Sequence, residues 1–188
     1  MSVVDWAQVL TGIAAILAVF VALWQARISR DAARDQLRMS REDLKVHLLL
    51  QYEDRWEAPT MMALRRALAG RLLDSHVYRA SSALPDSTYD VIGDEIPGFF
   101  ESLAFMHRRR DIDTDAAWAF FDYWAQRYWA ALQSFVGTDR ARHGADAWAD
   151  FEGLVRVFRA HSATHGGVRP VDEADLEDFL KQERHVGA

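Results

Sequence analysis

Residues 6–24, WAQVLTGIAAILAVFVALW, decide how the chain is organised. The segment contains no charged side chain and only two polar ones. At about 1.5 Å per residue, a helix of this length approaches the roughly 30 Å hydrocarbon core of a bilayer. Trp6 and Trp24 stand at its two ends, and indole rings favour the headgroup boundary. The segment therefore predicts a transmembrane helix, within an anchor that we assign to residues 1–26.

Three other interpretations compete with a membrane span. A cleaved signal peptide needs a basic N-terminal region, but the only charged side chain before the segment is Asp5. A buried core helix would also be apolar all round, but it leaves the paired tryptophans and the charge change after residue 26 unexplained. An interfacial helix requires a polar face, and residues 9–24 offer none. A spanning helix is the interpretation that we adopt.

Charge predicts the orientation of the anchor. No basic side chain precedes the segment, whereas five arginines follow it: Arg27, Arg30, Arg34, Arg38 and Arg41. Positive residues remain on the cytoplasmic side, so the N-terminus should lie outside and the main domain inside. The first two arginines, with the two tryptophans, are the expected membrane-interface residues. Arginine is far more abundant than lysine, as is typical of GC-rich bacteria, so we expect a single-pass protein of the bacterial inner membrane.

The rest of the chain predicts an all-α fold. Residues 27–43 contain neither Gly nor Pro, so the membrane helix should continue as a charged stalk in which a coiled-coil seam would be short. Residues 44–184 should form an antiparallel bundle of about five helices, followed by a frayed tail at 185–188. The longest loop is expected over residues 75–95, and we find no alternating strand pattern.

Helix starts can be assigned from caps and prolines. Pro59 and Pro97 suit the first turn of a helix, while Asp113 or Thr114, and later Asp172, can accept a hydrogen bond from a free backbone N–H. The clearest helix begins at Asp113 or Thr114. Its aromatic side chains recur at three-to-four spacing until Gly137 and predict a core stripe. Further helices are expected from Trp148 to before Gly166, and through Leu176 and Leu180.

Composition excludes several kinds of site. The chain has no cysteine, so disulfides, thiolate nucleophiles and cysteine-ligated metals are absent. A net charge of −6 argues against nucleic-acid binding, which needs a clustered positive surface. We find no phosphate-binding loop or catalytic motif, and we expect no cofactor. The pair His161 and His165 has metal-ligand spacing on a helix, but further ligands are not identifiable, so it is a weak candidate.

Two carboxylates lie among apolar core candidates, namely Glu101 and Glu152. Buried acids need partners, and Arg65, Arg66 and Arg142 are suitable ones. The five residues could form ion pairs that join the helices. Alternatively, they could form a pocket for a small polar ligand or for acid–base chemistry. We favour the ion-pair interpretation.

The layout resembles an uncharacterised family of bacterial single-pass proteins with an N-terminal membrane helix, an arginine-bearing stalk and a helical cytoplasmic domain of unknown function. The resemblance covers roughly residues 9–160. It is carried by these segments: residues 48–53 (LLLQYE), 59–61 (PTM) with Arg65 and Arg66, 99–101 (FFE), 111–113 (DID), and Trp148 with Phe151 and Glu152. It implies a membrane location and a helical fold, and it implies no activity.

Together these features predict a membrane-anchored interaction, scaffold or sensor module. Its expected partners are the lipid bilayer and either another protein or a second copy of the chain. An enzyme or ligand-binding domain that uses the pocket of Glu101, Glu152 and the arginines is the alternative.

Overall fold

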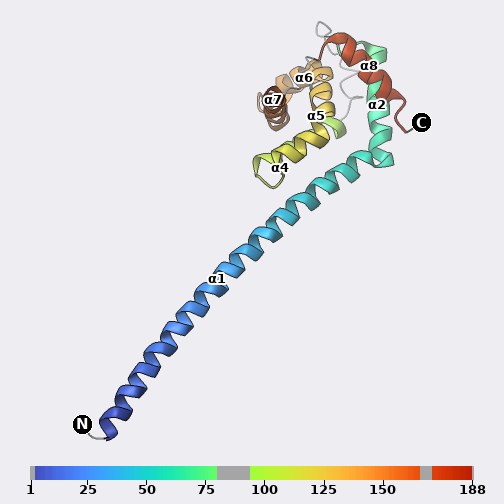
Figure 1. Cartoon of the computed structure of the whole chain (residues 1–188). Helices are drawn as coiled ribbons and strands as arrows, with labels where there is room; N and C mark the ends of the chain where they lie inside the picture. Colours follow the sequence, from blue (N-terminus) through green and yellow to red (C-terminus); the bar gives the residue numbers. More distant parts are fainter. Residues whose placement is uncertain (1–2, 80–93, 166–170, 188) are drawn as a thin grey trace. The chain divides into compact units, whose positions relative to one another are not determined.

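The computed structural model describes the backbone of residues 3–79, 94–165 and 171–187, and their side chains from residue 24 onward (Figure 1). Within these ranges the chain forms seven helices and no strand, so the predicted all-α class is confirmed. The predicted 75–95 loop falls largely on residues outside the described ranges. The chain divides into two compact units, Met1–Leu44 and Lys45–Ala188.

Helix α1 (Val3–Glu57) is 55 residues long and includes the predicted anchor and stalk. Among the residues that the structure describes, no helix has a stretch long and apolar enough to cross a bilayer. The side chains on which the predicted span rests, up to residue 23, lie outside the described ones. Transmembrane character therefore stays a prediction, whereas the helical backbone is observed. From Trp24 to Leu44 every side chain is exposed.

The second unit begins with the end of α1, where Leu49 and Trp56 are buried and the Tyr52 hydroxyl lies 2.7 Å from that of Ser102. Six further helices follow. Helix α2 packs against α8, and α4 and α5 both pack against α7 (Figure 1). Their bounds are α2 (Pro59–Ser75), α4 (Glu95–Arg108), α5 (Thr114–Ala131), α6 (Gln133–His143), α7 (Ala149–Thr164) and α8 (Glu173–Arg184).

The predicted caps are found at the starts of α5 and α8. The Asp113 carboxylate accepts hydrogen bonds from the N–H groups of Asp115 and Ala116, at 3.0 and 3.2 Å. The Asp172 carboxylate accepts one from the Asp175 N–H at 2.8 Å. These contacts satisfy backbone donors that have no partner within the helix. Short-range sequence signals therefore set where both helices begin.

The helix predicted to end at Gly137 is different in the structure. It breaks at Leu132, and α6 then continues to His143. Leu132 leaves helical geometry with ψ of 9°, although its N–H still donates to the Tyr128 carbonyl at 2.9 Å. Gly137 is tolerated inside α6, and the helix stops at Gly144, whose φ of 111° suits glycine. Trp148 was also expected inside the next helix, but it precedes α7 with φ of 61°.

Aromatic side chains fill the core of the second unit. Trp56 lies 4.8 Å from Phe99 between ring centroids, and Phe100 stacks on Phe151 at 4.8 Å with an interplanar angle of 12°. Tyr128, from the predicted aromatic stripe of α5, is fully buried. Such tilted and stacked pairs add to the free energy gained by burying the rings. The core brings the end of α1 together with α4, α5 and α7.

Candidate functional site

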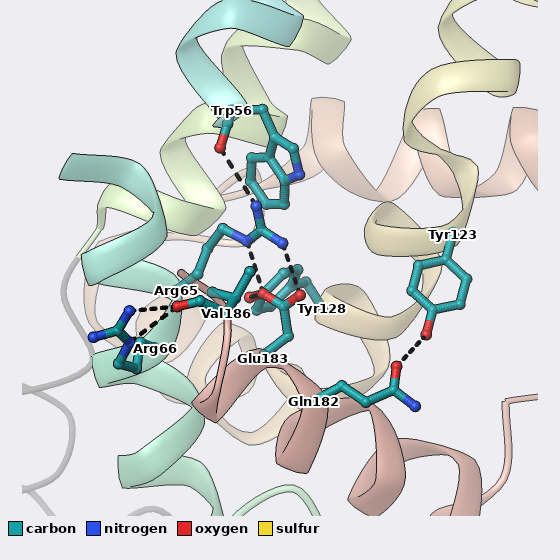
Figure 2. A network of polar contacts seen from close by, with 8 residues as sticks. All are labelled: Trp56, Arg65, Arg66, Tyr123, Tyr128, Gln182, Glu183 and Val186. Atoms are coloured by element: carbon teal, nitrogen blue, oxygen red, sulfur yellow. Dashed lines mark hydrogen bonds and ion pairs between the residues drawn. The ribbon is translucent and has the colours of Figure 1, made fainter. Parts of the chain in front are cut away.

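A buried ion pair joins α2 to α8. The Arg65 guanidinium donates from Nε and from its second amino group to the two carboxylate oxygens of Glu183, at 2.7 Å each (Figure 2). Only 2% of the Arg65 side chain and 7% of the Glu183 side chain are exposed. Two parallel hydrogen bonds of this kind are the strong form of an arginine–carboxylate contact. The pair therefore fixes the two helices in one register.

Residues from two more helices complete this network. The Tyr128 hydroxyl of α5 donates to Glu183 Oε2 at 2.6 Å. The guanidinium of Arg65 lies over the Trp56 ring, 4.4 Å from its centroid, and also donates to the Trp56 carbonyl at 3.4 Å (Figure 2). The buried carboxylate thus accepts three hydrogen bonds, as a charge removed from water requires. The end of α1 meets α2, α5 and α8 at this point.

The pKa shifts within the network indicate a structural contact between the helices. Burial is the largest single effect on the pKa of the Arg65 guanidinium and lowers it, but the hydrogen bonds and charge of Glu183, together with Tyr128, raise the pKa overall. Burial, reinforced by the Glu183 charge, also raises the pKa of the Tyr128 phenol well above its ordinary value. Both groups therefore keep their protons near neutral pH. Neither is suited to exchange protons with a substrate.

Arg66, the neighbour of this ion pair on α2, holds the C-terminal segment. Its guanidinium donates two hydrogen bonds to the Val186 carbonyl, one of them 3.0 Å long from Nε (Figure 2). Nearby, Arg184 forms an ion pair with Asp74 at 3.2 Å. The two adjacent arginines of α2 thus both contact the C-terminal part of the chain. Residue 186, which we expected to be frayed, makes defined contacts with α2.

Glu101 stabilises the start of α7. Its carboxylate accepts hydrogen bonds from the N–H groups of Phe151 and Asp150, at 2.6 and 3.3 Å. Burial raises its pKa, although these two hydrogen bonds act in the opposite direction. A carboxylate at this place also complements the positive end of the helix. The contact has a structural role that the sequence did not reveal.

Glu152 follows Phe151 in the chain, but its carboxylate has different partners from the carboxylate of Glu101. Its carboxylate binds Arg140 at 2.7 Å and Arg156 at 3.4 Å. The hydrogen bond from Arg140 is the largest cause of its lowered pKa. Arg142, the partner suggested by the sequence, is exposed on α6.

Four of the five candidates therefore occupy three separate settings, and the fifth, Arg142, is exposed on α6. Arg65 and Arg66 contact α8 and the residues after it, Glu101 contacts the backbone of α7, and Glu152 contacts Arg140. No hydrogen bond or ion pair between described residues joins the α2 arginines to either carboxylate. The partner missed in the sequence is Glu183. It could have been found, because it follows Leu176, Phe179 and Leu180 at helical spacing and so lies on the apolar face of α8.

The rings of His161 and His165 stack on each other at 4.0 Å, with an interplanar angle of 20°. Their lone pairs thus lie in nearly parallel planes and do not converge on one metal ion. Trp118 packs against both rings, and an Asp115 carboxylate oxygen lies 3.7 Å from His161 Nδ1. No group of three potential ligands suited to a metal ion occurs among the described side chains.

The predicted membrane-interface residues belong to the first unit. Trp24, Arg27 and Arg30 are exposed, and the side chain of Trp6 lies outside the described residues. The aromatic and basic character expected of a headgroup boundary is thus present on the exposed surface of α1 at residues 24–30.

Comparisons with protein-family models, with curated proteins and with solved structures found no match. The resemblance to a family of bacterial single-pass proteins therefore stays a prediction, and the functional argument rests on the residues of this chain.

Proposed function

We propose that the chain is a single-pass membrane protein whose cytoplasmic helical domain is an interaction module, and that it meets a protein partner or a second copy through the exposed part of α1. The observation that supports this most directly is an accumulation of large apolar side chains on a helix surface that no described residue covers. Ile28, Leu37, Met39 and Leu44 have 51, 62, 62 and 56% of their surface exposed.

These side chains are arranged in a way that suits a second helix. Leu37 and Leu44 are seven residues apart and share one face of α1, as in a heptad seam. Ile28 and Met39 are eleven residues apart, or about three turns, and share another face. A helix without tertiary contacts is only marginally stable in water, so a partner that buries either face would stabilise this part of the chain.

The membrane part of the proposal is supported by the apolar segment at residues 6–24, by the arginines that follow it, and by the helical backbone that continues through both. Because the chain has no cysteine, single cysteines report topology cleanly. With a membrane-impermeant maleimide, Ser2→Cys should react in intact spheroplasts, and Ser40→Cys should react only after permeabilisation. A chain that alkaline carbonate extracts from membranes, or the reverse labelling pattern, would contradict the anchor.

Self-association can be tested by cross-linking the same full-length chain in mild detergent. Single cysteines at Leu37 and Leu44, or at Ile28 and Met39, should form disulfide dimers efficiently if that face is the interface. Gln36→Cys lies between the two faces and is the matched control. Purification from the native membrane should also yield a defined oligomer or a stoichiometric partner. A persistent monomer with neither would overturn the interaction proposal.

The alternative function, a ligand-binding or catalytic pocket formed by Glu101, Glu152 and the arginines, has no specific observation in its favour. Glu101, Glu152 and the arginines of α2 are engaged with different partners, as described above.

A further inference from the structure

A basic cleft of about 380 Å³ lies between the end of α4 and the start of α5. Its lining contains three cationic side chains, from Lys45 of α1, from Arg108 at the end of α4 and from Arg110 just after that helix, and a single carboxylate, that of Asp113. The chain as a whole carries a net charge of −6. The cleft is thus a basic site on an acidic protein.

Arg110 stands out among these residues. It adopts a left-handed conformation, with φ of 64°, at the position after the α4 cap where glycine is normally favoured. Within the described part of the chain, its guanidinium makes no hydrogen bond or ion pair. The adjacent arginines differ, because Arg108 binds Asp150 at 3.1 Å and Arg109 binds Asp111 at 3.0 Å. The left-handed backbone of a residue other than glycine costs free energy, and no contact of the guanidinium within the described part of the chain offsets that cost, which suggests a partner outside the chain.

The remaining polar groups of the cleft are one carboxylate and one neutral pair. The Asp113 carboxylate is engaged by the backbone N–H groups at the start of α5. His107 Nε2 and the Thr114 hydroxyl lie 2.9 Å apart. Burial lowers the pKa of His107, so the ring is neutral at neutral pH. One member of the pair donates to the other, which leaves one neutral hydrogen-bond donor for a further acceptor. The positive charge of the cleft therefore comes from the lysine and the two arginines.

We propose that this cleft binds a phosphate group, with Arg110 as the principal ligand and Arg108 and Lys45 as supporting charges. The planar guanidinium presents donors in a fork that matches two phosphate oxygens, and a lysine adds a point charge. The group could belong to a soluble phosphate or to the headgroup of an anionic lipid, since both offer the same chemistry. The inference does not depend on the membrane anchor or on the contacts of α1.

The test is a titration of the isotope-labelled full-length chain in a neutral detergent, followed by NMR. Inorganic phosphate should cause saturable shifts of the amide signals of Arg110 and Thr114. Arg110→Gln should weaken binding about tenfold, which corresponds to the loss of a charge-assisted hydrogen bond, and Arg108→Gln should weaken it less. Arg156→Gln, an exposed arginine of α7, is the matched control and should leave the affinity unchanged.

A second arm identifies the source of the phosphate group. Dihexanoyl phosphatidic acid, a soluble lipid with a phosphomonoester headgroup, is titrated beside inorganic phosphate, and dihexanoyl phosphatidylcholine serves as the zwitterionic control. Binding of the acidic lipid at least about tenfold tighter than phosphate would support a lipid headgroup, and similar affinities would support a soluble phosphate. The absence of saturable shifts with either probe, or equal weakening by Arg110→Gln and Arg156→Gln, would overturn the proposal.

Discussion

Arg65 and Glu183 are 118 positions apart in the chain, yet their side chains form two hydrogen bonds of 2.7 Å in the interior of the domain. Replacing one member leaves an uncompensated buried charge or donor. Arg65→Met or Glu183→Gln should therefore lower the free energy of unfolding by about 3–5 kcal/mol. Guanidinium chloride unfolding of the full-length chain, followed by tryptophan fluorescence, measures the loss.

The double variant Arg65→Met/Glu183→Leu separates the value of the pair from the cost of breaking it. Apolar residues of similar volume often replace a buried ion pair with little loss, so we expect the double variant to be more stable than either single one. Retained stability in both single variants, within about 1 kcal/mol of the unmodified chain, would show that the ion pair does not hold α2 and α8 together.

An exposed ion pair in the same domain should behave differently. Glu152 and Arg140 are also 2.7 Å apart, but 38 and 29% of their side chains are exposed. Exposed pairs contribute about 0–1 kcal/mol, because water screens the charges and two long side chains lose conformational freedom. Glu152→Gln should therefore have a small effect in the same unfolding experiment. If Glu152→Gln lowered the free energy of unfolding as much as Glu183→Gln, the distinction between the exposed and the buried ion pair would be wrong.

The titration of Glu101 should make stability depend on pH. Its pKa is raised by burial in the folded chain. The folded state then holds this proton more tightly than the unfolded state, whose pKa is about 4.3. The stabilisation is fully present below that value and is lost as the pH rises through the raised folded-state pKa. The difference in unfolding free energy between the unmodified chain and Glu101→Gln should therefore fall as the pH rises through this window.

Glu152→Gln is the matched control for that experiment, because the pKa of Glu152 is shifted in the opposite direction from that of Glu101. The hydrogen bond from Arg140 lowers the pKa of Glu152. Its contribution is present above the unfolded pKa and is lost as the pH falls through the folded-state pKa. The difference between the unmodified chain and this variant should thus rise with pH. The same slope for both variants would mean that their surroundings do not control the two carboxyl groups as described.

Much of the fold follows from short-range signals. Asp113, Asp172 and Pro59 mark helix starts that the structure contains, and the aromatic spacing of α5 identified its buried face. These features depend on backbone donors and on helical periodicity within a few residues. The break at Leu132 could not be inferred in that way. No Gly or Pro lies close to it, so no local signal marks the end of the helix there.

The candidate site was harder to predict for the same reason. The sequence offered Arg65 as a partner for Glu101 or Glu152 and missed Glu183. The spacing of α8 places Glu183 on the apolar face of that helix, but nothing local connects residues 65 and 183. Glu101 was recognised as a buried acid, but its ligands are backbone N–H groups of α7, which any sequence could supply. The sequence shows which charged residues are available to form ion pairs. Tertiary packing decides which of them meet.

Arg110 allows backbone strain and charge to be separated. Because φ is 64°, a side chain at this position is disfavoured, and glycine is not. Arg110→Gly should raise the free energy of unfolding by about 1 kcal/mol relative to Arg110→Ala, after the greater freedom of glycine in the unfolded chain is included. Both variants lack the guanidinium, so both should lose phosphate binding equally. Equal stability of the glycine and alanine variants in guanidinium chloride unfolding would contradict the strain, while unequal phosphate affinities would show that the backbone conformation, and not only the charge, forms the cleft.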